Sequence, residues 1–108
     1  MGFFGNLVNA ISGSGSETIP DNAIFIDVRS QGEVVGGTID GAINIPLPEI
    51  GAKAEKALPK KATPIIVFCA SGIRSGLAKK SLKSLGYEQV INGGGISSLA
   101  IRLGKRIV

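Results

Sequence analysis

Short apolar runs alternate with stretches of helical periodicity along this chain. Four of the runs predict strands, at residues 23–28, 42–45, 65–68 and 90–91. The third run, Ile65-Ile66-Val67-Phe68, would be apolar on both faces of a strand. Because a parallel strand buried on both faces lacks polar alternation, this run predicts the central strand of a parallel sheet.

Residues with helical spacing follow the second, third and fourth runs and predict one helix after each. The first helix is expected to begin near Pro48, whose fixed φ suits a helix start, and to end at Pro59. The other two are expected to end at Gly86 and Gly104, since glycine commonly ends helices. The expected apolar faces are Ile50, Ala54, Ala57 and Leu58; Ile73, Leu77, Ala78, Leu82 and Leu85; and Ile96, Leu99, Ala100 and Leu103.

This alternation predicts an α/β domain at residues 19–108, with a small, mostly parallel central sheet and helices on both faces. The glycines at 93–95 are expected to form a turn before the last helix. In open parallel sheets, ligands bind beyond the carboxyl ends of the strands. The residues that follow the third strand are therefore the first place to look for a functional site.

Residues 1–18 fall outside this pattern. Apolar residues recur there at helical spacing and are followed by a Ser/Gly run at 12–16, which predicts a short helix and a flexible linker. Such a helix could dock on the domain, or it could contact a membrane or a partner protein. No basic residue precedes the apolar part, so it does not resemble a signal peptide, and no segment predicts a transmembrane helix.

Composition narrows the class of protein. A chain of 108 residues with 44% hydrophobic content fits one domain, and 5% aromatic content predicts an aliphatic core. The net charge of +4 comes from basic residues that are spread over several segments, so nucleic-acid binding is not expected. The mild positive charge is compatible with small anionic substrates. One cysteine and no histidine predict no disulfide framework, no metal site and no cofactor, and favour a reducing, cytoplasmic location.

The single cysteine, Cys69, stands where the central strand gives way to a helix. Six residues follow it in the candidate loop: Ala70, Ser71, Gly72, Ile73, Arg74 and Ser75. Backbone N–H groups and a helix N-terminus lower the pKa of a thiol and would hold an anionic group attached to its sulfur. The alternatives are an inert buried cysteine, a surface role for Arg74, and helix capping by Ser71 or Ser75.

Three segments together resemble the single-domain rhodanese family of sulfurtransferases. They are Asp27-Val28-Arg29 through Glu33 and on to Pro46, the loop from Cys69 to Ser75, and Leu85-Gly86-Tyr87 followed by the glycines at 93–95. The resemblance covers residues 19–104, and three motifs in the right order are far more specific than one. The chain departs from the family at Thr38, where histidine is usual, and at Leu99, where tryptophan is common.

The resemblance implies transfer of a sulfane sulfur from a small anionic donor such as thiosulfate to cyanide or a thiol, through a persulfide on Cys69. The amides of residues 70–75 would stabilise the thiolate and the persulfide, and Arg74 would bind the oxyanions of the donor. Ser71 and Ser75 would donate to the same anion or cap the helix. Asp27, Arg29 and Glu33 would form structural ion pairs or contribute to the electrostatics of the site.

Three other functions remain open. Phosphatases and arsenate reductases with a similar loop have five residues between cysteine and arginine, whereas four separate Cys69 from Arg74 here, which favours sulfur over a larger oxyanion. A non-catalytic binding module would not need the retained Cys69. A sulfur carrier for a partner protein would use the same chemistry with a different acceptor.

Overall fold

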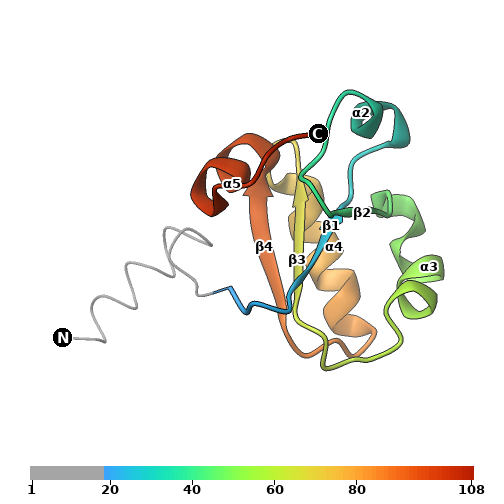
Figure 1. The fold of residues 1–108 in the computed structure, drawn as a ribbon. Coiled ribbons are helices and arrows are strands. Elements are labelled where there is room, and N and C mark those ends of the chain that lie inside the picture. Colours follow the sequence, from blue (N-terminus) through green and yellow to red (C-terminus); the bar gives the residue numbers. More distant parts are fainter. Residues whose placement is uncertain (1–18) are drawn as a thin grey trace.

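Strands and helices alternate along the chain in a computed structural model that describes residues 19–108 (Figure 1). The interpretations of residues 1–18 therefore lie outside the described residues. The elements, in chain order, are β1 (Ile24–Asp27), α2 (Gln31–Val35), β2 (Ile43–Asn44), the 3-10 helix η2 (Leu47–Glu49), α3 (Ile50–Ala57), β3 (Ile65–Cys69), α4 (Ile73–Ser84), β4 (Val90–Gly95) and α5 (Ile96–Leu103).

The sheet has four parallel strands in the order β2-β1-β3-β4. β3 lies between β1 and β4, and all five of its residues are buried. A strand flanked on both edges and covered on both faces can carry apolar side chains throughout. The prediction of a central parallel strand is therefore confirmed.

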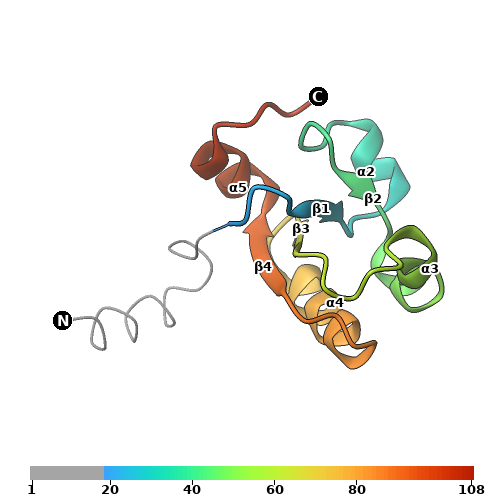
Figure 2. The ribbon, with the colours of Figure 1, turned by 60° about the horizontal axis from the view of Figure 1, so that its bottom comes forward.

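Helices cover both faces of the sheet, as predicted (Figure 2). α3 and α4 pack on one face and α5 packs on the other. The first face has a core that includes Ile26, Val28, Ile50, Ala54, Ile65, Val67, Cys69, Ala78, Leu82 and Tyr87. The second face has a smaller core that includes Ile39, Ile66, Phe68, Leu99 and Ala100. Cys69 thus belongs to the larger core.

The glycines at 93–95 are not a turn, contrary to the prediction. They form the second half of β4, and α5 follows without a separate connection. The pairing of β3 with β4 shifts by one residue here, because Val67 pairs with Asn92 and Phe68 pairs with Gly94. A run of glycines is a strong turn signal, but here the residues pair with the buried central strand.

Two further expectations differ from the structure. Ile73 and Leu77, predicted for the apolar face of α4, are 74% and 53% exposed, whereas Ala78 and Leu82 of the same predicted face are buried together with Ser75. At 100° per residue, Ile73 and Leu77 lie nearly opposite that buried stripe. α2 was not predicted, although Ser30 and Glu33 form a capping box at its start.

Candidate active site

Cys69 is the last residue of β3, at the carboxyl end of the sheet, and Ile73 begins α4 four positions later. Three loop residues connect the two elements. The side chain of Cys69 has no exposed surface. The cysteine therefore lies at the carboxyl end of the sheet, which is where ligands bind in open parallel sheets, and a helix N-terminus is directly beside it.

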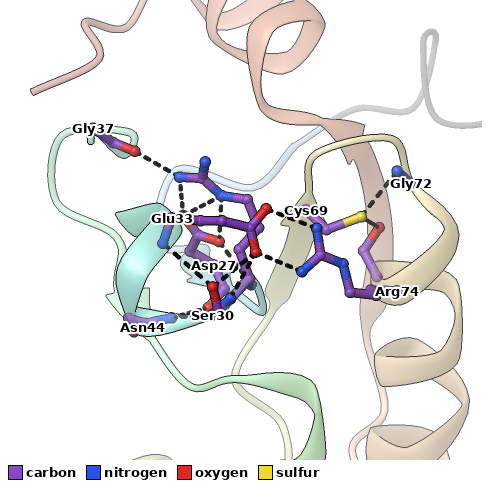
Figure 3. A network of polar contacts seen from close by, with 10 residues as sticks. Asp27, Ser30, Glu33, Gly37, Asn44, Cys69, Gly72 and Arg74 are labelled. Carbon is purple, nitrogen blue, oxygen red and sulfur yellow. Dashed lines mark hydrogen bonds and ion pairs between the residues drawn. The ribbon is translucent and has the colours of Figure 1, made fainter. Parts of the chain in front are cut away.

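Two polar groups contact the Cys69 sulfur (Figure 3). The amide N–H of Gly72 donates to Sγ at 2.9 Å, and the Ser75 hydroxyl oxygen lies 3.4 Å from Sγ. Burial alone would raise the pKa of the Cys69 thiol, but hydrogen bonds from the Ser75 hydroxyl and from the amides of Ser75, Gly72 and Ser71 outweigh it. The net effect places this pKa below its ordinary value.

The loop after Cys69 rests directly on the end of β4. Gly72 has a φ of 99°, a conformation that favours glycine. Gly95 pairs with Cys69 in the sheet, and a Cβ added to Gly95 would lie 2.6 Å from the carbonyl oxygen of Ala70. Any side chain at position 95 would therefore displace the loop. This role was missed because the glycines were interpreted as a turn.

Ala70, Ser71 and Ile73 are exposed residues. The contribution of Ser71 to Cys69 comes from its amide. No serine caps α4, because its N-cap residue is Gly72 and has no side-chain cap hydrogen bond. Ser75 is instead fully buried and contacts both Cys69 and Asn92.

Asn92, in β4, connects the loop to the sheet. Its Nδ2 donates to the carbonyl of Gly72 at 3.2 Å, while its Oδ1 accepts from the amide of Gly94 at 2.9 Å and from the hydroxyl of Ser75 at 2.7 Å. Sequence analysis missed this residue. The only signal was a polar side chain within an apolar strand pattern, next to three glycines.

Arg74 and Glu33 form an ion pair between α4 and α2 (Figure 3). Nη1 and Nη2 of Arg74 donate to the two carboxylate oxygens at 2.7 and 2.9 Å. The hydrogen bond from Arg74, together with those from Ser30, lowers the pKa of Glu33 to about 2. Hydrogen bonding to Glu33 raises the pKa of Arg74. The two nitrogens predicted to bind a donor anion are therefore already held by a carboxylate.

Asp27 and Arg29 form a second, buried ion pair. Nη2 of Arg29 donates to Oδ2 of Asp27 at 2.7 Å and to the carbonyl of Gly37 at 2.6 Å. The Thr38 hydroxyl also donates to Asp27 Oδ2, at 2.7 Å. Threonine thus supplies a hydrogen bond at the position where the family usually has histidine. None of these contacts involves the cysteine loop, whereas Glu33 contacts Arg74 in the first turn of α4.

Residues 19–108 contain no candidate metal site and no candidate membrane-spanning helix. No group of three or more His, Cys, Asp or Glu side chains in this range could hold a metal ion. None of the helices in the same range is both long enough and apolar enough to cross a membrane.

Comparison with known proteins gives a consistent result. A family model, the Rhodanese-like domain, matches residues 14–100. The thiosulfate sulfurtransferase PspE of Escherichia coli is 39% identical over 77 residues, which cover 71% of this chain and 74% of PspE. A solved structure, "rhodanese with anions from E. coli", has a TM-score of 0.67 at 39% identity and covers 69% of this chain and 88% of that one.

A third relative has a different description. The putative sulfur carrier protein YrkF of Bacillus subtilis is 34% identical over 68 residues. The match covers 63% of this chain but only 36% of YrkF.

Proposed function

The chain belongs to the rhodanese-like domain family, and on that premise we propose that it moves a sulfane sulfur from thiosulfate or a related anionic donor to a thiophilic acceptor through a persulfide on Cys69. Its sulfurtransferase relatives support sulfur transfer in general. The donor, the acceptor and the persulfide are the new elements of the proposal.

The observation that carries the proposal is the surroundings of the Cys69 sulfur. A thiolate is the nucleophile in such chemistry, and it needs donors that compensate for the loss of water. Gly72 donates to the sulfur, Ser75 lies within reach of it, and the pKa of the thiol is lowered despite full burial. An inert structural cysteine in an apolar core would have a raised pKa instead.

In the first half-reaction, the Cys69 thiolate attacks the outer sulfur of thiosulfate. A new S–S bond forms on Cys69 while the S–S bond of thiosulfate breaks, and sulfite leaves with the electron pair. The three negative charges of the reactants are conserved as a persulfide anion and sulfite. The loop amides that stabilise the thiolate would also stabilise the terminal sulfur of the persulfide.

In the second half-reaction, cyanide or a thiolate attacks the terminal sulfur. Its bond to Cys69 breaks, and the cysteine leaves as a thiolate with the electron pair. The products are thiocyanate or a small-molecule persulfide, together with the starting enzyme. Because donor and acceptor meet the same sulfur in turn, the kinetics are ping-pong.

Arg74 is the group proposed to bind the oxyanion end of the donor. Its side chain is 38% exposed, and it lies in the first turn of α4, directly after the loop that follows Cys69. A guanidinium offers a planar fork of donors that suits such oxygens. The donor would compete with Glu33, whose carboxylate makes the same kind of contact.

Steady-state kinetics with thiosulfate and cyanide test the proposal. Parallel double-reciprocal lines are expected for the wild type, and Cys69→Ser should release no thiocyanate while keeping the wild-type circular dichroism spectrum. Ser81→Ala is the control, because Ser81 is exposed on α4 and lies outside the cysteine loop. Intersecting lines, or turnover by folded Cys69→Ser, would contradict a persulfide on this residue.

A sulfur carrier that serves a partner protein is the second candidate, favoured by the similarity to YrkF. The chemistry at Cys69 would be the same, but a protein persulfide or polysulfide would be the donor. Cys69 that takes up sulfur from polysulfide but not from thiosulfate would support this alternative.

A further inference from the structure

The side-chain amide of Asn92 has a fixed orientation beside the active-site loop. Its Nδ2 faces the carbonyl of Gly72 at 3.2 Å, and its Oδ1 faces the amide of Gly94 at 2.9 Å. A flipped amide would place donor against donor and acceptor against acceptor. The oxygen is therefore the end of Asn92 that meets the Ser75 hydroxyl, at 2.7 Å.

Ser75 has two acceptors for one proton. A hydroxyl donates a single hydrogen, and the Ser75 oxygen lies 2.7 Å from Asn92 Oδ1 and 3.4 Å from Cys69 Sγ. Ser75 has no exposed surface, so bulk water offers no third partner. The proton must point either to Asn92 or to the sulfur.

The charge on the sulfur decides between these two arrangements. A neutral thiol can donate its own proton to Ser75, whose hydroxyl then donates to Asn92. A thiolate has no proton to give and is stabilised by donors, so the Ser75 proton turns toward it. Asn92 Oδ1 still accepts from Gly94 after that turn, so no buried polar atom loses its last partner.

We propose that Asn92 is a positioning residue that holds the Ser75 proton while the Cys69 sulfur is uncharged and releases it when the sulfur becomes a thiolate. This inference rests on the proposed function, in which the sulfur alternates between thiolate and persulfide. In the persulfide, the charge has moved to the terminal sulfur and Sγ is neutral. The Ser75 proton then returns to Asn92, and it turns back as Cys69 leaves in the second half-reaction.

A double-mutant cycle on the pKa of the Cys69 thiol tests the proposal. The four proteins are wild type, Asn92→Ala, Ser75→Ala and the double variant, and the rate of alkylation by iodoacetamide across pH gives each pKa. Asn92→Ala also removes the contact with Gly72, which loosens the loop in both backgrounds. Comparing the two backgrounds cancels that effect and isolates the coupling through Ser75.

With Ser75 present, Asn92→Ala frees the hydroxyl proton for the thiolate. We therefore compare the change in the pKa of Cys69 that Asn92→Ala causes in two backgrounds. In the wild-type background this change should be more negative than in the Ser75→Ala background, by about 0.5 to 1. No coupling would make Asn92 a loop anchor only, and coupling of the opposite sign would mean that Asn92 holds Ser75 toward the sulfur. Either result overturns the proposal.

A second variant keeps the test decisive if Asn92→Ala does not fold. Asn92→Asp keeps an acceptor oxygen and strengthens it, so it should raise the pKa of Cys69 more when Ser75 is present than in Ser75→Ala. An equal rise in both backgrounds would be a pure charge effect and would contradict the proposal.

The other charged groups of the site are unchanged in all these proteins: Arg74 with Glu33, and Arg29 with Asp27. The alkylation assay uses no sulfur donor. The two proposals can therefore fail separately. If the alkylation assay shows the expected coupling but the protein transfers no sulfur in the kinetic assay, the proposed function is contradicted and the inference about the Ser75 proton stands.

Discussion

Glu33 holds both terminal nitrogens of Arg74, at 2.7 and 2.9 Å, although the two residues are 41 positions apart in the chain. The pair connects α2 to the first turn of α4, beside the cysteine loop. Because a carboxylate and the oxyanion end of a sulfur donor make the same contacts with a guanidinium, Glu33 and the proposed donor would compete for Arg74.

Weakening that competition should strengthen donor binding. In Glu33→Gln the neutral amide holds Arg74 less tightly, so the KM for thiosulfate should fall about two- to fivefold, as expected for a partly exposed ion pair. Arg74→Ala should raise this KM about tenfold or more. Glu55→Gln, which removes the ion pair between Glu55 of α3 and Lys61, is the matched control. A higher KM in Glu33→Gln would mean that Glu33 positions Arg74 for the donor.

Alkylation of Cys69 should depend on pH with a midpoint below that of a free cysteine. The pKa of Cys69 is lowered, so the thiolate is present above that value and disappears as pH falls through it. The rate with iodoacetamide should fall about tenfold per pH unit well below the midpoint, and the midpoint itself should lie below the value of about 8.5 for a free cysteine. A midpoint at or above about 8.5 would show that burial outweighs the donors.

The contact between Gly95 and Ala70 predicts a sharp steric effect. Gly95→Ala places a methyl group 2.6 Å from the Ala70 carbonyl oxygen, so it should displace the loop, lower the free energy of unfolding by about 1–3 kcal/mol and abolish most sulfur transfer. Gly51→Ala is the matched control, because nothing lies within 4 Å of its added Cβ in α3. Urea unfolding and turnover measure both effects. Wild-type behaviour of Gly95→Ala would contradict the close approach of loop and strand.

Thr38 should contribute to stability through Asp27. Thr38→Val keeps the shape of the side chain but removes the hydroxyl that donates to this buried carboxylate, at an expected cost of about 1–3 kcal/mol in the free energy of unfolding. Thr38→Ser keeps the hydroxyl and should lose less. If urea unfolding gives the two variants equal stability, the hydrogen bond contributes nothing.

Local patterns were sufficient to predict the sheet and the position of the cysteine. Ile65–Phe68 has the apolar pattern of a strand buried on both faces, and a glycine- and serine-containing loop directly after it places Cys69 at the carboxyl end of the sheet. These inferences need only residues that are neighbours in the chain. For the same reason, the helices that follow β3 and β4 were predicted correctly.

The contacts that shape the site join residues far apart in the chain, and the sequence pattern does not reveal them. Gly95 is needed because Ala70 passes over it, and Asn92 matters because it faces Ser75. Ile73 was assigned to a buried face by its apolarity, but only packing decides which side of α4 meets the sheet. Likewise, the engagement of Arg74 by Glu33 depends on where α2 lies.

Intact-protein mass spectrometry tests the central claim most directly. The protein is incubated with thiosulfate, its mass is measured, and the measurement is repeated after cyanide is added. The account predicts a gain of about 32 Da, one sulfur, that maps to Cys69 and disappears with cyanide, as covalent catalysis requires. No gain with thiosulfate, polysulfide or a protein persulfide would contradict a persulfide on Cys69.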